Sequence, residues 1–134
     1  MVVQKSETLS LTTHTDIVLA RQKARQWAIE LGFRLIDQTK IVTATSELAR
    51  NTVDYGGGGV MRLEVIKDGM RNGFRLTFED EGPGIPDINL ALQDGYTTGN
   101  GMGLGLSGSK RLMDDMTISS APGQGTQISI VRWK

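Results

Sequence analysis

The sequence of 134 residues predicts an α+β fold, a two-layer sandwich in which helices cover one face of a mixed, mostly antiparallel sheet. Two observations support this fold class. Most strand-like segments follow one another in pairs, joined by short turns rich in glycine, as in hairpins. The helix-like segments are grouped, and each has an apolar face that must be buried against another element. The length fits one domain over residues 1–134.

The first part of the chain predicts one strand and two helices. Residues 7–13, ETLSLTT, alternate between polar and apolar side chains and predict the strand. Thr15 or Asp16 is the expected cap of a helix that ends at Gly32, and Asp37 is the expected cap of a second helix over residues 38–55. The side chains expected to face the core are Ile17, Ala20, Ala24, Trp27, Ala28 and Leu31 in the first helix, and Ile41, Val42, Thr45, Leu48, Ala49, Thr52 and Val53 in the second.

The rest of the chain predicts four strands and a third helix. Alternating segments at 60–67 and 74–80 flank the hairpin loop DGMRNG. After a glycine-rich stretch, a helix is expected over about residues 104–114. Two strands then follow at 116–120 and 125–133, joined by the turn APGQG.

Charge and composition exclude several classes of function. Fifteen basic and fifteen acidic residues cancel and no basic run stands out, so we expect no nucleic-acid partner. No apolar segment is long enough to span a bilayer, so no membrane association is expected. The chain has no cysteine, and its first residues lack the apolar core of a signal peptide. These features predict a cytoplasmic protein.

The segment TTGNGMGLGLSGSKRLMDD, residues 97–115, places several glycines directly before a helix. Glycine lets the backbone approach a phosphate group, and the free N–H groups of a first helical turn point toward it. A simple flexible loop is the alternative. A Rossmann fingerprint is excluded because no strand precedes the glycines, and a P-loop is excluded because Gly-Lys-Ser/Thr is missing.

Three further groups of residues also indicate nucleotide binding. Glu47, Asn51 and Asp54 lie on one face of the second helix, where an amide oxygen beside a carboxylate suits Mg²⁺, although a solvated polar face is the plainer interpretation. Asp80 ends a strand before the turn Gly82-Pro83-Gly84, and its carboxylate is a candidate acceptor for the exocyclic amine of a base. An ordinary turn explains the same residues. Thr126 opens the last strand and is a candidate neighbour of that base.

Together the segments SELARN, DEGPGI, GMGLGL and GQGT resemble, in order and spacing, the Bergerat-type ATP-binding fold of gyrase, heat-shock chaperone ATPases, histidine kinases and mismatch-repair ATPases. The chain looks most like the bacterial serine kinases of anti-sigma pathways, the RsbT-type switch kinases of the stressosome. Segments such as DQTKIVTATSELARN and GLSGSKRLMDD carry that likeness, which extends from about residue 10 to the end.

The resemblance implies ATP and Mg²⁺ as cofactors and a role for each matching residue. Asn51 would coordinate Mg²⁺, Glu47 would be the general base or orient the attacking hydroxyl, and Asp80 would bind the adenine amine. Residues 90–102 would form a lid over the nucleotide. The implied nucleotide-binding set is Asn51, Asp80, Gly82, Gly84, Ile85, Thr98, Gly101, Met102, Gly103, Leu104, Gly105 and Thr126.

The resemblance also implies partners. The family phosphorylates a serine or threonine of a small STAS-domain protein and, on release, activates a PP2C-type phosphatase by binding it. Two alternatives stay open: a nucleotide-gated binding module whose catalysis is dispensable, and an anti-sigma factor that holds a sigma subunit directly. A gyrase-like module is disfavoured because no transducer domain is present. The single histidine, His14, is expected to be a surface residue without a partner, and the run Gly56–Gly59 has no assigned role.

Overall fold

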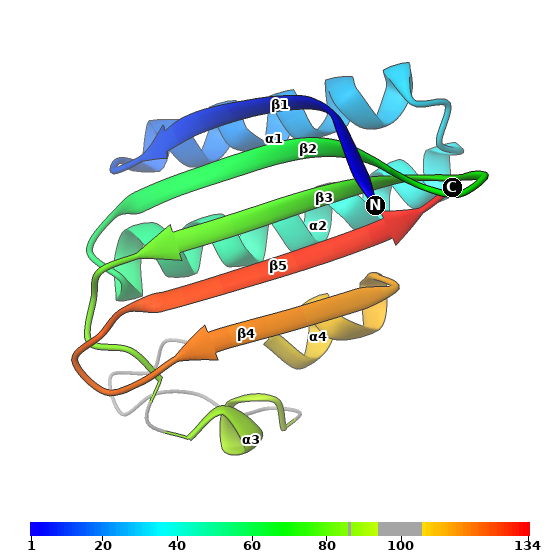
Figure 1. The fold of residues 1–134 in the computed structure, drawn as a ribbon. Coiled ribbons are helices and arrows are strands. Elements are labelled where there is room, and N and C mark those ends of the chain that lie inside the picture. Colours follow the sequence, from blue (N-terminus) through cyan, green and yellow to red (C-terminus); the bar gives the residue numbers. More distant parts are fainter. Residues whose placement is uncertain (86, 94–105) are drawn as a thin grey trace.

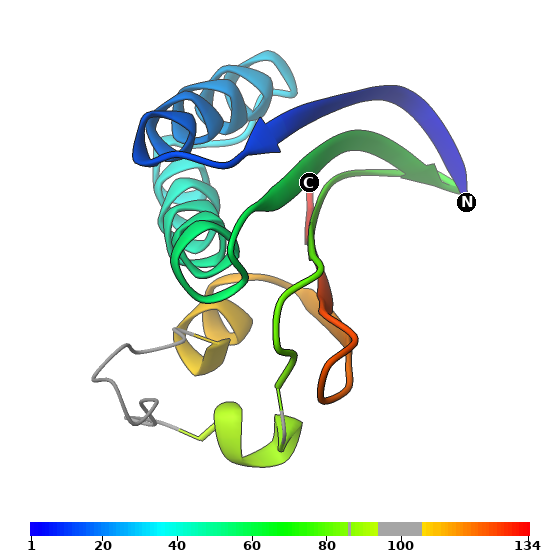
Figure 2. The same ribbon diagram turned by 90° about the vertical axis from the view of Figure 1, so that its left-hand side faces the viewer.

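The computed structural model describes residues 1–85, 87–93 and 106–134. Within them, α1, α2 and α4 pack on one face of a single sheet, which confirms the predicted two-layer α+β sandwich (Figures 1 and 2). The elements are β1 (Val2–Leu11), α1 (His14–Glu30), α2 (Leu35–Arg50), the π-helical turn η1 (Asn51–Tyr55), β2 (Gly59–Asp68), β3 (Arg71–Asp80), α3 (Ile88–Ala91), α4 (Leu106–Leu112), β4 (Asp115–Ser120) and β5 (Thr126–Trp133).

The sheet has the strand order β1-β2-β3-β5-β4. All four pairings between the described strands are antiparallel, so the mixed pairing allowed by the prediction does not occur among them. Asp80 at the end of β3 lies opposite Gly59 of β2 and opposite Thr126 of β5. This register brings the Gly56–Gly59 run and the GQGT turn to the two sides of Asp80.

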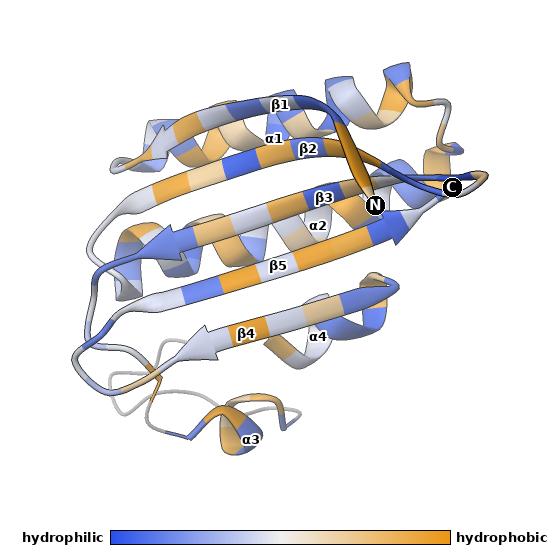
Figure 3. Cartoon of the chain, viewed as in Figure 1, coloured by the Kyte–Doolittle hydropathy of each residue, from blue (hydrophilic) through white to orange (hydrophobic). Residues whose placement is uncertain are grey.

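The core lies between the sheet and the helices α1 and α2. Strand residues that face the helices alternate with polar residues on the open face, and Figure 3 shows this alternation along β3 and β5. Trp27 of α1 stacks on Phe74 of β3 with ring centroids 5.9 Å apart. The apolar side chains predicted for the two helices are buried except Leu31 and Val53, which are partly buried. Burial of this kind supplies the main driving force for folding.

The start of α1 corrects the predicted cap. Thr13, not Thr15 or Asp16, is the N-cap. Its Oγ1 accepts a hydrogen bond from the Asp16 amide at 3.2 Å, and Asp16 Oδ2 accepts one from the Thr13 amide at 3.1 Å. This reciprocal pair is a capping box, which satisfies two amides that the helix leaves free. Asp16 is therefore the third residue of the helix.

The second helix starts before the predicted cap Asp37 and changes its pitch at the end. Its N-cap is Arg34, which makes no side-chain capping bond, while Asp37 lies inside the first turn and is buried. The predicted helical path to Tyr55 is confirmed, but its last five residues form the π-helical turn η1. In that turn the Gly56 amide donates to the Asn51 carbonyl at 2.8 Å, which is the wider i to i+5 bond.

Candidate functional site

A narrow pocket lies between the end of α2 and the adjoining ends of β3 and β5. It brings together four residues predicted for the site, namely Asn51, Asp80, Ile85 and Thr126. The remaining lining residues are Leu48, Thr52, Tyr55, Phe78, Leu106 and Ile128. A mostly apolar wall with a few convergent polar groups is the usual character of a small-molecule site.

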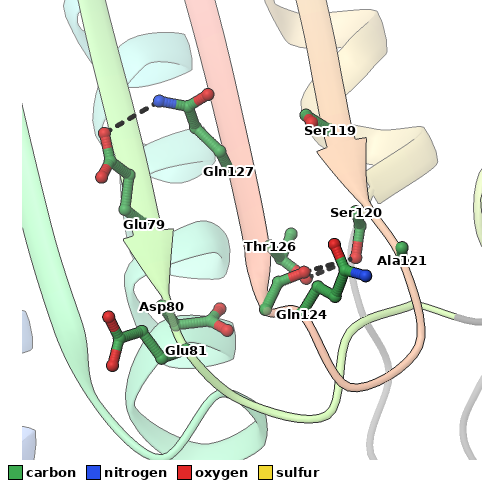
Figure 4. Close-up of a pocket in the computed structure, with 10 residues that line it drawn as sticks. Glu79, Asp80, Glu81, Ser119, Ser120, Ala121, Gln124, Thr126 and Gln127 are labelled. Carbon is green, nitrogen blue, oxygen red and sulfur yellow. Dashed lines mark hydrogen bonds between the residues drawn. The ribbon is translucent and has the colours of Figure 1, made fainter.

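Asp80 is the acidic group of this pocket. Its Oδ1 accepts a hydrogen bond from the Gly82 amide at 2.9 Å, and Figure 4 shows it beside Thr126 at the ends of β3 and β5. Burial raises the pKa of the Asp80 carboxyl above its ordinary value, while the backbone amides of Gly82 and Thr126 act in the opposite direction. A partly buried carboxylate is suited to accept a hydrogen bond from a ligand.

The loop after Asp80 is held by two side chains that the sequence did not single out. The Tyr55 hydroxyl donates to the Gly84 carbonyl at 3.1 Å. The Ile85 amide donates to Ser120 Oγ at 2.8 Å, and Ser120 in turn bonds the Gly125 carbonyl and the Thr126 hydroxyl. These contacts fix the wall of the pocket that Ile85 provides. Neither residue belonged to a motif, and only the fold brings them to this loop.

Gly84 is required for a backbone reason as well as for space. It has a φ of +79°, a conformation that residues with a side chain rarely adopt. A Cβ at Gly84 would also overlap the Ala121 carbonyl. The predicted role of Gly84 in shaping the pocket therefore has a geometric basis, while its contact with a nucleotide stays a prediction.

Asn51 lies where α2 changes into the π-helical turn. Its side chain lines the pocket, and the residue is only 9% exposed. The plainer interpretation of Asn51 as part of a solvated polar stripe is therefore wrong. A π-helical turn inserts one extra residue and redirects the side chains around it, and such turns are frequent at functional sites. No pattern in the sequence predicted this turn.

Glu47 lies one helical turn before Asn51 but does not line the narrow pocket. Its side chain is 41% exposed, and its Oε1 is 3.7 Å from Nη1 of Arg50. An ion pair with this much exposure contributes little to stability. Glu47 is therefore available to a second molecule that approaches the end of the pocket from solvent.

Several predicted site residues cannot be placed. Thr98, Gly101, Met102, Gly103, Leu104 and Gly105 lie outside the described residues, and so does most of the segment expected to form a lid. Of that segment, Leu90 and Ala91 belong to the single helical turn α3. Leu106, the first described residue after Gly105, opens α4 and lines the pocket.

His14 does not lack a partner, contrary to the prediction. Its Nε2 lies 2.6 Å from Oδ1 of Asp54 in the π-helical turn. The pair joins the start of α1 to the end of the second helix, although the His14 side chain is 75% exposed. Asp54 is thus engaged by His14 and does not line the pocket with Asn51.

A second, more open groove of about 410 Å³ lies across the same end of the sheet (Figure 4). It includes Glu79, Ser119 and Gln127, of which Gln127 lies between the buried residues Thr126 and Ile128 and therefore faces the side of the sheet without helices. Glu79 and Gln127 already bond one another there, with Nε2 2.8 Å from Oε1. We place the candidate ligand site in the narrow pocket, because there the polar groups converge from helix and sheet together.

The groups in the pocket fit a nucleotide better than a metal ion held by the protein alone. Within residues 1–85, 87–93 and 106–134, no group of three His, Cys, Asp or Glu side chains gathers to hold a metal. Magnesium commonly takes one or two protein oxygens and completes its shell with phosphates and water. Asn51, which lines the narrow pocket, carries such an oxygen.

Comparison with known proteins finds a family model and several relatives. The family model described as histidine kinase-, DNA gyrase B-, and HSP90-like ATPase matches residues 36–134. The chain is 47% identical over 123 residues to the serine/threonine-protein kinase RsbT of Bacillus subtilis, covering 92% of each chain. It is 30% identical over 119 residues to an anti-sigma F factor of Thermoanaerobacter sp., covering 85% of this chain and 82% of the relative.

A solved structure shares the fold at lower identity. The RsbU and RsbW domains of a Mycobacterium tuberculosis protein match with a TM-score of 0.65 and 21% identity. The match covers 98% of this chain and 33% of that longer one. In the part of the chain that the structure describes, no helix has the length and apolar character needed to cross a membrane.

Proposed function

The chain belongs to the family of histidine kinase-, DNA gyrase B- and HSP90-like ATPases, and it is a serine/threonine-protein kinase of the partner-switching kind. From this premise we propose that it transfers the γ-phosphoryl group of magnesium-ATP to a serine or threonine of a STAS-domain protein. The observation that carries the proposal is the convergence of Asn51, Asp80 and Thr126 in one pocket beside Glu47.

We propose that the narrow pocket receives the adenine ring. Asp80 would accept a hydrogen bond from the adenine amine, with Thr126 beside it and Ile85 against the ring. The glycines of the loop keep the backbone close without filling the pocket, and Tyr55 and Ser120 hold the loop in place. Guanine has a carbonyl oxygen where adenine has the amine, so the Asp80 carboxylate would reject it.

We propose that Asn51 supplies the one protein ligand for Mg²⁺, and that residues 101–105 cradle the phosphates. When bound, the ion neutralises the charge on the transferring phosphoryl group. The contribution of the chain is positioning: Asn51 orients the phosphates, and Glu47 accepts the proton of the attacking hydroxyl from the solvent side. The exposure of Glu47 supports this role, because a protein substrate must reach it.

The proposed partners follow from the same family. A STAS-domain protein would be the substrate, and a PP2C-type phosphatase would be activated when the kinase leaves that substrate and binds it. A transfer assay tests the proposal: purified kinase, labelled magnesium-ATP and a STAS-domain protein are mixed, with a variant of the acceptor serine as control. Label on the acceptor residue is the expected result, and no label on any STAS-domain protein would contradict it.

The second candidate function is a nucleotide-gated binding module that sequesters a sigma subunit. The similarity to an anti-sigma F factor over 85% of this chain favours it. The transfer assay alone does not separate the two, since a sequestering module would hold its partner tightly with ATP whether or not transfer occurs. A pull-down with a purified sigma subunit, with and without ATP, measures that binding.

A further inference from the structure

Gly56 joins the two halves of the candidate site. It is buried directly after the π-helical turn, and its amide donates to the Asn51 carbonyl at 2.8 Å. On its other side it packs against the carboxyl group of Asp80, at the end of β3. A single backbone position therefore contacts both the residue proposed to bind Mg²⁺ and the residue proposed to read the base.

The backbone conformation does not require glycine at position 56. Gly56 has φ −80° and ψ −11°, a right-handed conformation that any residue adopts. The requirement is space, because a Cβ at this position would overlap Cγ of Asp80 and lie 2.5 Å from its Oδ2. The next residue has the opposite character, since Gly57 has a φ of +76° and a Cβ there would meet no atom within 4 Å.

The Asp80 carboxyl has little freedom to move away from position 56. Its Oδ1 is held by the Gly82 amide, and a Cβ at Gly82 would lie 2.6 Å from the Gly56 carbonyl oxygen. The backbones of Gly56 and Gly82 therefore touch, with the carboxyl group of Asp80 packed against both. Behind it, a Cβ at Gly125 would overlap the Asp80 carbonyl oxygen.

We propose that Gly56 is a positioning residue for base selection: the missing side chain at position 56 sets where the Asp80 carboxylate lies and thereby lets it discriminate adenine from guanine. This inference rests on the proposed function, in which Asp80 accepts from the adenine amine. It also gives a role to the first glycine of the Gly56–Gly59 run, which the sequence alone left without one.

The variant Gly56→Ala tests the proposal by calorimetric titration with ATP and with GTP. A displaced carboxylate loses its charge-assisted bond to the amine, so ATP affinity should fall about tenfold or more, while the weak GTP affinity stays within a factor of about two. The ratio of the two affinities is the informative readout, since a general loss of structure would lower both. Gly57→Ala is the matched control, expected to lower the melting temperature and leave the ratio unchanged.

A double-mutant cycle shows whether the effect passes through Asp80. In an Asp80→Asn background the carboxylate that accepts from the adenine amine is already absent, so Gly56→Ala should change ATP affinity by less than about twofold. An equal loss in both backgrounds would overturn the proposal. Where Gly56→Ala alone does not fold, Asp80→Gly added to it removes the overlap and should restore the cooperative melt. A double variant that stays unfolded would also overturn it.

The wild-type titration separates this inference from the proposed function. A wild-type protein that does not bind ATP, or that binds GTP equally well, defeats the proposed function itself. A wild-type protein that prefers ATP, together with a Gly56→Ala variant that keeps the full preference, defeats only the role of Gly56.

Discussion

Asp37 and Arg132 are 95 residues apart in the sequence, and Oδ1 of Asp37 accepts a 2.8 Å hydrogen bond from Nη2 of Arg132. The same guanidinium reaches the Leu112 carbonyl at 3.3 Å and the Asp114 carboxylate at 3.4 Å. This arginine thus connects the first turn of α2 with β5 and with the end of α4. Asp37 is only 9% exposed, so its charge depends on that partner.

Replacing Arg132 should therefore destabilise the protein. Arg132→Met leaves a buried carboxylate without its main partner, and we expect the free energy of unfolding to fall by about 2–4 kcal/mol. Denaturant titration at pH 7 measures it. Arg34→Met is the matched control, because Arg34 bonds the same carboxylate at 3.4 Å but is 81% exposed. Its effect should stay below about 1 kcal/mol.

The pH dependence of the same variant has a definite sign. The hydrogen bond from Arg132 lowers the pKa of Asp37 in the folded protein. The pair therefore stabilises the fold above the unfolded pKa of about 3.9, and that stabilisation is lost as the pH falls through the folded value. The gap in unfolding free energy between wild type and Arg132→Met should narrow on acidification. A gap that stays constant down to about pH 2 would show that Arg132 acts by packing alone.

Asp37 also shows where prediction from sequence ends. An acidic residue before an apolar helical run is a good cap candidate, but a partner 95 residues away decides its role instead. The cap of α1 was missed for a related reason: four cap-type residues stand close together, and only the reciprocal bonds between Thr13 and Asp16 select one. The apolar faces and hairpins were predicted correctly, because periodicity and turn chemistry are local.

The candidate site shows the same difference between residues that local patterns predict and residues that only long-range contacts bring into place. Asn51 and Asp80 were singled out from the spacing of motifs, and the structure brings them into one pocket. Tyr55 and Ser120 were missed, because their hydrogen bonds to the loop depend on the π-helical turn and on the β4–β5 hairpin. The spacing of Glu47, Asn51 and Asp54 indicated one polar stripe, but Glu47 is exposed beside Arg50, Asn51 lines the pocket and Asp54 pairs with His14.

Asp80→Asn should weaken nucleotide binding while stabilising the protein. Losing a charge-assisted hydrogen bond to the adenine amine should cost about 1.5–3 kcal/mol of ATP affinity. Calorimetry with ATP and GTP measures this, and Glu81→Gln, an exposed neighbour, is the control. Unchanged ATP affinity in Asp80→Asn would remove Asp80 from base recognition.

The stability change follows from the raised pKa of Asp80, which is caused by burial. A group whose folded pKa is raised stabilises the fold below its unfolded pKa, and this contribution is lost as the pH rises through the folded value. The charged carboxylate is therefore unfavourable at pH 7, and asparagine avoids that cost while still accepting from the Gly82 amide. Thermal melts should show Asp80→Asn at or above the wild type at pH 7, with the advantage lost in acid. A variant that melts clearly lower at pH 7 would contradict this account.

Asn51→Ala should remove most of the magnesium dependence of ATP binding. The wild type is expected to bind ATP more tightly with Mg²⁺ than with a chelator present, since Asn51 supplies an oxygen to the ion. In the variant the two affinities should approach one another. Thr43→Ala, an exposed change on the same helix, should keep the wild-type difference. A full magnesium effect in Asn51→Ala would exclude this residue as the ligand.

Glu47→Gln should separate chemistry from binding, and so decide between a kinase and a binding module. The side chain is 41% exposed, outside the narrow pocket, and paired only loosely with Arg50, so the substitution should leave the melting temperature within about 2 °C. ATP affinity should barely change for the same reason. Glutamine keeps the size and hydrogen bonding of glutamate but cannot take a proton, so transfer to a STAS-domain protein should fall by about 10²–10⁴-fold.

A time course of phosphate transfer on wild type and on Glu47→Gln, beside thermal melts and ATP titrations, measures the transfer rate, the melting temperature and the ATP affinity. Equal transfer rates would remove Glu47 from catalysis, and tight ATP-dependent binding of the partner without transfer by the wild type would favour the binding module.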